Sequence, residues 1–202
     1  MADSDTDAIR AVRRGDTDRY AELVDRYQGP ALRLAFGLLG NYEDARDVSQ
    51  EAFVSAYQSL GRFRGAAKFS TWLYRIIVNK CHDALRVRLR QPSVAAGVGE
   101  PDPGTNGHGW FVVDAEDPAA GPRDGLANRE LADALQQAIG ELSMNQRTAF
   151  MLHHLQGYAL AEAAEMMGCR TGTVKSHLFR AVEHLRHRLA PRMGTGGTSW
   201  TS

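Results

Sequence analysis

The chain has 202 residues, and its 24 lysines and arginines balance 24 aspartates and glutamates, so its formal net charge is zero. It contains no run of 18 apolar residues, and its acidic start, MADSDTDAIR, lacks an apolar segment. This argues against a signal peptide or membrane insertion and indicates a cytoplasmic protein. The two cysteines, Cys81 and Cys169, are far apart and form no CxxC motif, so neither a disulfide framework nor a zinc site is expected.

The charge is distributed in four blocks of alternating sign. Residues 1–61 carry 7 basic and 11 acidic side chains, and residues 91–169 carry 3 and 11. Residues 62–90 carry 8 basic side chains and 1 acidic one, and residues 170–202 carry 6 and 1. Two basic blocks separated by acidic ones indicate two surfaces for a polyanion. Ordinary solvated helix faces are the alternative explanation.

The first 90 residues are predicted to form helices, because their apolar residues recur with a period of 3.6. The Gly29-Pro30 pair interrupts one segment and predicts a kink or a break into two helices. A basic, glycine-containing loop, GRFRGAAKF, precedes the last and longest helix. The predicted helices cover residues 6–14, 17–39, about 42–60 and about 71–89.

Residues 91–125 hold five prolines and many glycines with an acidic bias, which predicts a flexible linker. As a coil its ends would lie about 30–35 Å apart, and fully extended it would span about 115 Å. Its segment GWFVVDAED is too apolar for a simple spacer and is expected to dock on a surface. Residues 191–202 are expected to be a disordered tail. Between them, helices are predicted at 126–140, 144–156, 159–167 and 172–189.

Polar side chains mark several predicted helix starts. Asn41 is expected to cap the third helix, with Asp44 as its partner in a capping box. Ser70 and Thr171 are expected to cap the helices that follow them. Since no segment shows sustained strand alternation, the predicted fold is all-α, with two small helical domains, 1–90 and 126–190, on either side of the linker.

The last two helices have the spacing of a helix-turn-helix, with the turn at Gly168-Cys169-Arg170. One face of the final helix carries hydroxyl, imidazole and basic groups that suit base edges and phosphates in a major groove. A helical hairpin with a polar exterior is the alternative. The polar face holds Thr173, Lys175, Ser176, His177 and Arg180. The opposite, buried stripe is expected to hold Val174, Leu178, Ala181, Val182, Leu185 and Leu189.

The long helix at 71–89 and the loop before it mix basic groups with aromatic rings. Such a mixture suits nucleic acid with unstacked bases, because rings accept the bases while cations hold the backbone. The alternative is a basic helix over an aromatic core, and spacing places Phe69 and Trp72 in that core. The basic and polar face holds Arg62, Arg64, Lys68, Arg75, Asn79, His82, Arg86 and Arg90.

Three other groups of reactive side chains are candidates for catalysis or metal binding. Asp44, Asp47 and Glu51 form an acidic strip, but no histidine stands at ligand spacing, which favours a protein-binding or solvated surface. His153 and His154 are adjacent on a helix and are expected to point apart, against a shared metal. Cys169 lies beside Arg170, which favours a lowered thiol pKa. No enzymatic activity, metal or cofactor is expected.

Two long segments together resemble a known family. EDARDVSQEAFVSAYQSLGRFRGAAKFSTWLYRIIVNKCHDALR resembles region 2 of bacterial sigma factors, and ELSMNQRTAFMLHHLQGYALAEAAEMMGCRTGTVKSHLFRAVEHLRHRL resembles region 4. With no helical domain between them, the chain is similar to the extracytoplasmic-function (ECF) group over about residues 7–90 and 126–190. The resemblance implies binding to core RNA polymerase, with region 2 reading and melting the −10 promoter element and region 4 reading the −35 element.

The resemblance also implies roles for individual residues. The helix that docks on the clamp helices of the β′ subunit corresponds to Asp47, Gln50, Glu51, Phe53 and Tyr57. The −10 reader corresponds to Arg62, Arg64, Lys68, Arg75, Asn79, His82 and Arg86, with Asn79 as the residue expected to contact an unstacked base. The −35 reader corresponds to Thr171, Thr173, Lys175, Ser176, His177 and Arg180. The implied partners are core RNA polymerase (its β′ clamp helices and β flap), promoter DNA and, as a further candidate, an anti-sigma factor.

Some positions depart from the family pattern. Ala159 stands where a serine or threonine cap is usual, a loss of about 1 kcal/mol, and Ala163 replaces a larger aliphatic residue. Arg170 stands where proline is common. His177 and Phe179 replace a more usual arginine and histidine, which affects the expected −35 preference and leaves the fold intact.

Three other functions are less compatible with the sequence. A stand-alone helix-turn-helix regulator would need a dimer interface or an effector pocket, and the sequence shows neither clearly. A helical metal-carboxylate enzyme would need an inward Glu/His pattern that is missing. A protein-binding adaptor would leave both basic faces unexplained. Because the whole chain is neutral, weak promoter binding without polymerase is expected, with the acidic linker shielding the basic surfaces.

Overall fold

The computed structural model describes residues 2–90 and 132–190, and every regular element in these two ranges is a helix. This confirms the prediction of an all-α fold with two helical units. The N-terminal bundle (residues 2–90) consists of α1 (Ala2–Arg13), η1 (Thr17–Arg19), α2 (Tyr20–Leu39), α3 (Tyr42–Ser59), η2 (Leu60–Arg62) and α4 (Phe69–Arg90). The C-terminal bundle (residues 132–190) consists of a helix over 132–140, α6 (Met144–Phe150), the π-helical η4 (Met151–Leu155), α7 (Leu160–Met167) and α8 (Thr171–Leu189). The predicted linker with GWFVVDAED, and the predicted tail, lie outside the described residues.

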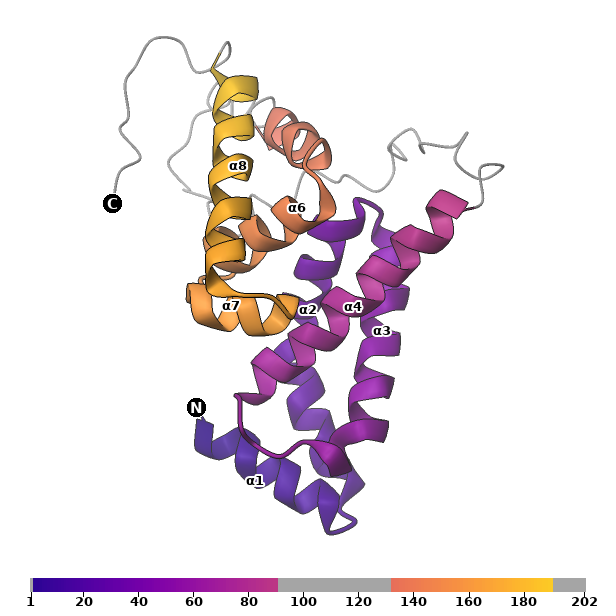
Figure 1. The fold of residues 1–202 in the computed structure, drawn as a ribbon. Helices are drawn as coiled ribbons and strands as arrows, with labels where there is room; N and C mark the ends of the chain where they lie inside the picture. The colour runs from indigo at the N-terminus through magenta and orange to yellow at the C-terminus, as the bar shows by residue number, and fades with distance from the viewer. Residues whose placement is uncertain (1, 91–131, 191–202) are drawn as a thin grey trace, which may run out of the picture.

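Helices α2, α3 and α4 pack together, and α1 lies across one end of them (Figure 1). Polar groups anchor α1, because Asp5 accepts hydrogen bonds from Arg26 and, at 2.6 Å, from the Tyr27 hydroxyl. Tyr20 joins α2 to α3 by donating to the Phe53 carbonyl at 2.7 Å, and burial raises the pKa of its hydroxyl to about 12. These buried polar groups are therefore satisfied within the bundle, as a stable core requires.

Several predicted helix boundaries differ from the observed ones, including the start of α1, which lies at Ala2 and not at residue 6. Helix α2 continues through Pro30 as one helix, so of the two predicted alternatives, a kink or a break, the break into two helices is wrong. Buried residues lie on both sides of the proline in α2, and their packing outweighs the lost backbone hydrogen bond. Ser70 lies inside α4, which begins at Phe69, and Thr171 is the first residue of α8, whose N-cap is Arg170.

The predicted cap at Asn41 is confirmed. Its side-chain oxygen accepts a hydrogen bond from the Asp44 backbone N–H at 2.9 Å. The Asp44 carboxylate, predicted to complete a capping box, lies instead 3.7 Å from the Arg88 guanidinium of α4. It therefore contributes to the pairing of α3 with α4.

The loop between α3 and α4 is held by an aromatic cluster. The ring centroids of Phe63 and Trp72 lie 5.1 Å apart, and those of Phe69 and Trp72 lie 5.8 Å apart. Arg13 of α1 donates to the carbonyls of Leu60 and Phe63 and closes the loop from the other side. Phe69 is buried, as its spacing predicts, and the basic side chains of this loop thus project from a fixed backbone.

In the C-terminal bundle, α7 and α8 form a helix-turn-helix. Helix α7 ends at Gly168, whose φ of 63° is the left-handed conformation that glycine adopts most easily. Of the predicted apolar stripe of α8, Val174, Leu178, Ala181 and Leu185 are buried, and Val182 and Leu189 are half-buried. Leu185 and Ala181 pack on the helix over 132–140, which places α8 between that helix and α7.

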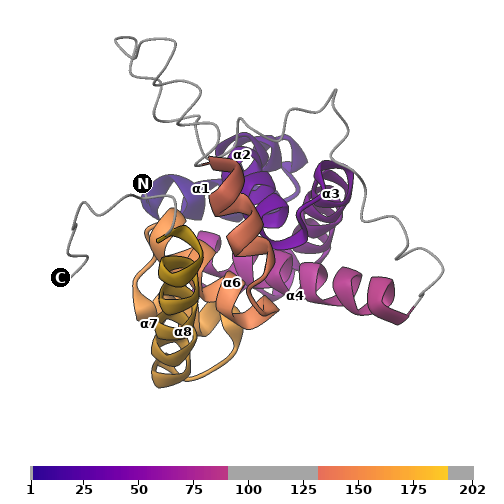
Figure 2. The same cartoon turned by 90° about the horizontal axis from the view of Figure 1, so that it is seen from above.

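The two bundles pack against each other, and α7 lies along α4 (Figures 1 and 2). The apolar residues on both sides belong to one buried cluster. The sequence predicts two domains joined by a flexible linker, and it does not predict that the two bundles pack against each other. The packing of the two bundles explains why Tyr74 of α4 is buried, since its ring meets that of Tyr158 in the C-terminal bundle.

Four pairs of residues make up what we call the inter-bundle contact. The rings of Tyr74 and Tyr158 meet edge to face with centroids 5.4 Å apart, and burial raises the pKa of both hydroxyls. Lys68 lies 2.8 Å from Glu162. Arg147 donates to the Leu38 carbonyl at 2.7 Å. A Cβ on Gly37 would lie 2.7 Å from the Met151 sulfur, so the Met151 side chain occupies the space that any larger residue at position 37 would need.

Candidate nucleic-acid and polymerase interfaces

The basic face of α4 and its loop is exposed. Helix periodicity and the buried residues of α4 turn this face outward, while the aromatic cluster supports the loop. Lys68 is the predicted residue that contacts the other bundle, through Glu162. Arg86 pairs with Asp83 at 3.3 Å on the surface of the same helix. The exposed members of the predicted set are Arg62, Arg64, Lys68, Arg75, Asn79 and Arg86.

His82 differs from the rest of this face. It is half-buried, and its Nε2 atom is buried without a hydrogen-bond partner among the described residues. Burial, with a smaller contribution from Arg86, lowers its pKa below the ordinary value of 6.5. The ring is therefore neutral at pH 7 and adds no positive charge to the face.

The polar face of α8 is exposed at Thr171, Thr173, Lys175, Ser176 and Arg180, and half-buried at His177. The buried stripe on the opposite side of α8 holds the helix on its bundle, so this face is presented on a rigid element. The Ser176 hydroxyl donates to the Gly172 carbonyl at 3.1 Å and is thus directed at its own helix. Lys175 and Arg180 are the cations available for phosphate contacts.

The acidic strip of α3 is a third exposed surface. Asp47 and Gln50 are exposed, and Glu51 lies 3.1 Å from Lys80 of α4. Phe53, predicted with this set, is 8% exposed and packs in the core, so its ring does not form part of the surface. Tyr57 is 41% exposed and its ring packs against Tyr20.

Val54 belongs to the same α3 surface and was missed by the sequence reasoning. It is 55% exposed, and it follows Asp47, Gln50 and Glu51 at helical spacing. An apolar side chain among acidic and amide groups is typical of a protein-binding surface. The available signal was the spacing from Asp47 to Val54, which places the valine on the polar side of α3.

The loss of a capping side chain at Ala159 is partly offset by Glu162. Its Oε2 atom accepts a hydrogen bond from the Ala159 backbone N–H at 3.1 Å, which leaves Oε1 for Lys68. The pKa of Glu162 falls below 4.5, mainly because of the hydrogen bond from Lys68. One carboxylate thus supports both the helix start and the inter-bundle contact.

Arg147 was not singled out from the sequence, yet its side chain donates to four carbonyls, three in its own bundle and one, that of Leu38, in the N-terminal bundle. Its guanidinium donates to Ile139 at 3.0 Å and to Leu142 at 3.4 Å, as well as to the carbonyls of Gly140 and Leu38. These carbonyls lie where two helices end, so the cation also meets the negative ends of two helix dipoles.

The thiol and imidazole predictions need correction. Burial raises the pKa of the Cys169 thiol, whereas the sequence predicts that it is lowered.

The rings of His153 and His154 were expected to point apart, but their centroids lie 5.0 Å apart, edge to face. His153 is hydrogen bonded to the Tyr158 carbonyl at 2.8 Å. Within residues 2–90 and 132–190, no three histidine, cysteine or acidic side chains gather as metal ligands.

None of the described helices is long and apolar enough to cross a lipid bilayer.

The chain matches two family models, sigma-70 region 2 over residues 23–91 and sigma-70 region 4 over residues 132–185. The first range lies in the N-terminal bundle and reaches one residue beyond its end, and the second lies in the C-terminal bundle. Between them they contain all three exposed surfaces.

Curated relatives match over nearly the whole chain. The chain is 35% identical to the ECF RNA polymerase sigma factor SigW of Bacillus subtilis, over 90% of this chain and 94% of SigW. It is 34% identical to the RNA polymerase sigma-H factor of Pseudomonas aeruginosa, over 94% of this chain and 95% of that protein. It is 35% identical to SigM of Mycobacterium tuberculosis, over 95% of this chain and 85% of SigM.

Two solved structures share the fold. One is CnrH in complex with the cytosolic domain of CnrY, with a TM-score of 0.62 and 23% identity, covering 93% of this chain and 98% of that one. The other is the sigma factor RpoE of Bartonella quintana in complex with the anti-sigma factor NepR, with a TM-score of 0.58 and 25% identity, covering 83% of this chain and 98% of that one. Both domain matches and full-length identity agree: the chain belongs to the extracytoplasmic-function sigma factors of the sigma-70 family, non-enzymatic proteins of promoter-specific transcription initiation.

Proposed function

We propose a division of this function among the three exposed surfaces. The α4 face with its loop reads and melts the −10 element, and the α8 face reads the −35 element. The α3 surface, with Val54 and without Phe53, binds the β′ clamp helices. The proposal assigns residues 1–90 and 126–190 to these two DNA-reading units. The observation that carries it is that two exposed cationic faces stand on different bundles, each backed by a buried apolar stripe.

We also propose that the bundles separate when the promoter is read. Elements centred near −10 and −35 lie about 25 base pairs apart, or about 85 Å of B-form DNA. A compact body of the size described here has a radius of gyration of about 15 Å. The closed form cannot reach both elements at once, whereas 35 extended residues span about 115 Å. Breaking the inter-bundle contact frees Lys68 for the −10 element.

Further proposed partners follow from the family and its solved structures. RpoE of Bartonella quintana was crystallised with an anti-sigma factor. We propose that an anti-sigma factor also binds this chain, and that the C-terminal bundle contacts the β flap of polymerase. The cytoplasm, where RNA polymerase acts, is the proposed location.

The direct test is transcription by bacterial core RNA polymerase from a library of promoter fragments, with and without the purified chain. We expect initiation that requires the chain and that is confined to fragments sharing two spaced motifs. A DNA footprint made by the chain alone, without binding to core polymerase, would instead support a stand-alone regulator.

Replacing Lys175 or Arg180 by alanine should weaken binding of the holoenzyme to all promoters alike. Each phosphate contact removed should reduce the slope of log K against log salt by about 1. The measurement is promoter affinity across a salt series, with Arg10→Ala on α1 as the control that leaves the slope unchanged. A loss confined to particular base pairs, of about 1–3 kcal/mol, would show that the residue reads bases instead.

Gly37→Leu should open the closed form without unfolding either bundle. The new side chain occupies the space of Met151, while leucine favours helix α2 by about 1 kcal/mol relative to glycine. Small-angle scattering should show a radius of gyration several ångström larger than that of the parent chain. The double variant Gly37→Leu, Met151→Ala restores room at the contact and should close again. A Gly37→Leu chain as compact as the parent would contradict the role of this contact.

A further inference from the structure

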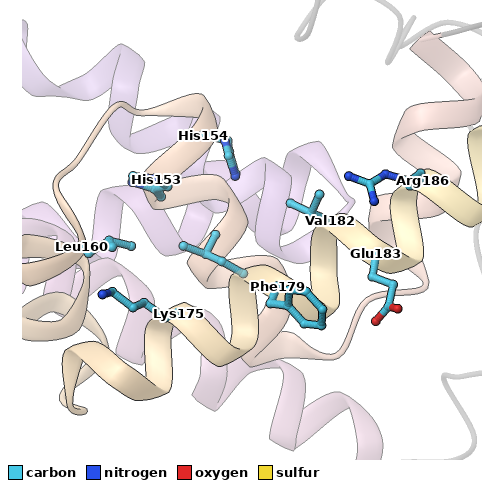
Figure 3. A pocket seen from close by; sticks show the side chains of 9 residues that line it. His153, His154, Leu160, Lys175, Phe179, Val182, Glu183 and Arg186 are labelled. Atoms are coloured by element: carbon cyan, nitrogen blue, oxygen red, sulfur yellow. The ribbon is translucent and has the colours of Figure 1, made fainter. Parts of the chain in front are cut away.

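The C-terminal bundle carries an open groove of about 380 Å³ between α8 and the end of η4 (Figure 3). Its α8 wall is a stripe of side chains on the flank of the proposed DNA-reading face. They are Lys175, Phe179, Val182, Glu183 and Arg186, and His154 stands opposite. The volume falls in the range of about 300–1,000 Å³ that is usual for ligand sites in proteins.

The groove has an apolar centre between two cations. Phe179 is 69% exposed, the most exposed large apolar side chain of the described residues, and Val182 lies beside it. Lys175 and Arg186 stand at either end, and neither is paired with an acidic side chain in residues 2–90 or 132–190. Glu183 is the single acidic side chain in the lining. An occupant should therefore combine bulky apolar groups with several carboxylates.

One segment of the chain outside the described residues has this composition. Residues 110–117 read WFVVDAED, four bulky apolar side chains followed by three acidic ones within four positions. Trp110 and Phe111 are the only aromatic residues between positions 91 and 125. Burying two aromatic rings against Phe179 removes apolar surface from water on both sides. The carboxylates that follow can then pair with Lys175 or Arg186.

The covalent connection allows this segment to reach the groove. Fourteen residues lie between position 117 and position 132, where the described part of the C-terminal bundle begins, and they allow a separation of up to about 50 Å when extended. A bundle of 59 residues has a radius of gyration of only about 10 Å. A tether of this length gives an effective concentration in the millimolar range, so even weak affinity suffices for occupancy.

We propose that residues 110–117 of the same chain occupy the groove beside α8 when the protein is free of polymerase. The occupant covers Phe179 and neutralises Lys175. Docking of this kind does not depend on whether α8 reads promoter DNA. It gives the acidic, apolar part of the linker a defined binding surface within its own chain.

Disulfide trapping in the full-length chain tests this proposal. The background is Cys169→Ser, with Cys81 retained because it is fully buried and burial raises the pKa of its thiol to about 12. The groove pair is Ala115→Cys with Glu183→Cys. The control pair is Ala115→Cys with Glu165→Cys, an exposed site on α7 in the same bundle but outside the groove. Circular dichroism verifies that each variant is folded.

We expect the groove pair to oxidise within one chain at least tenfold faster than the control pair under mild oxidant. Changing Trp110 and Phe111 to serine in the groove pair should abolish this preference, because the apolar anchor is lost. Equal rates for the two pairs would overturn the proposal. Disulfides formed mainly between two chains would also overturn it and would indicate that a second copy fills the groove.

Discussion

Arg147→Ala is expected to lower the free energy of unfolding by about 2–4 kcal/mol. The guanidinium donates to four backbone carbonyls. A hydrogen bond to a charged group contributes about 1.5–3 kcal/mol net, and the expected loss is less than four such values because Arg147 is only half-buried and water replaces some of the bonds. Burial of the Arg147 guanidinium lowers its pKa. Because the site is partly shielded, water does not reach all of the carbonyls that lose their hydrogen-bond donor in the alanine variant. Urea unfolding followed by circular dichroism measures the loss.

Two control variants make the Arg147 result specific. Arg147→Lys keeps the charge but not the planar fork of donors, so an intermediate loss is expected. Arg180→Ala removes an exposed arginine from the same bundle and should change stability by less than about 0.5 kcal/mol. If alanine at 147 had an equally small effect, the four hydrogen bonds would contribute little to the fold. Because Arg147 also donates to the Leu38 carbonyl of the other bundle, we expect Arg147→Ala to weaken the packing of the two bundles against each other.

Reversing charge at Glu51 is expected to weaken binding to core RNA polymerase by at least about 2 kcal/mol, or roughly 30-fold. The Glu51→Arg side chain would place a cation at the centre of the proposed clamp-binding surface. Loss of the Lys80 pair costs little stability, because Glu51 is 68% exposed in that pair and surface ion pairs contribute about 0–1 kcal/mol. Titration of labelled core polymerase with the variant measures the affinity.

The matched control for Glu51→Arg is Asp25→Arg. Asp25 is an exposed carboxylate on α2 in the same bundle, so the change in net charge is identical. We expect Asp25→Arg to bind polymerase as the parent chain does. Equal weakening by both variants would indicate a general electrostatic effect of net charge and would remove α3 as the specific docking surface.

The sequence predicts the helices well, because each carries its own apolar period. The stripe of α8 is an example, since Val174, Leu178, Ala181 and Leu185 recur at helical spacing and are all buried. Helix starts were less well predicted, and Ser70 shows why. A serine before a helical segment favours a cap, but Phe69 packs in the core, and the helix begins there, two residues before the predicted start. Tertiary packing thus outweighs a capping preference of about 1 kcal/mol.

The sequence predicts which helix faces are exposed. It does not predict contacts between residues that are far apart in the sequence. Exposure of Arg75, Asn79 and Arg180 follows from a single helix. Burial of Tyr74 depends on Tyr158 of the other bundle, and no local pattern indicates that pairing. From the sequence alone Arg147 is expected to be an exposed arginine. Its contacts become apparent only in the folded chain, where the ends of two helices lie next to its guanidinium. Phe53 illustrates the converse, because the family motif suggests a surface role whereas packing against α2 buries the ring.

The inter-bundle contact also bears on how this sigma factor competes for a limited pool of polymerase. If core enzyme binds only chains whose bundles have separated, the apparent dissociation constant equals the intrinsic one divided by the separated fraction. A chain that is separated 1% of the time would bind about 100-fold more weakly than its exposed surfaces allow. Residues far from both DNA and polymerase, such as Gly37 and Met151, would then set the threshold concentration at which this factor displaces its rivals.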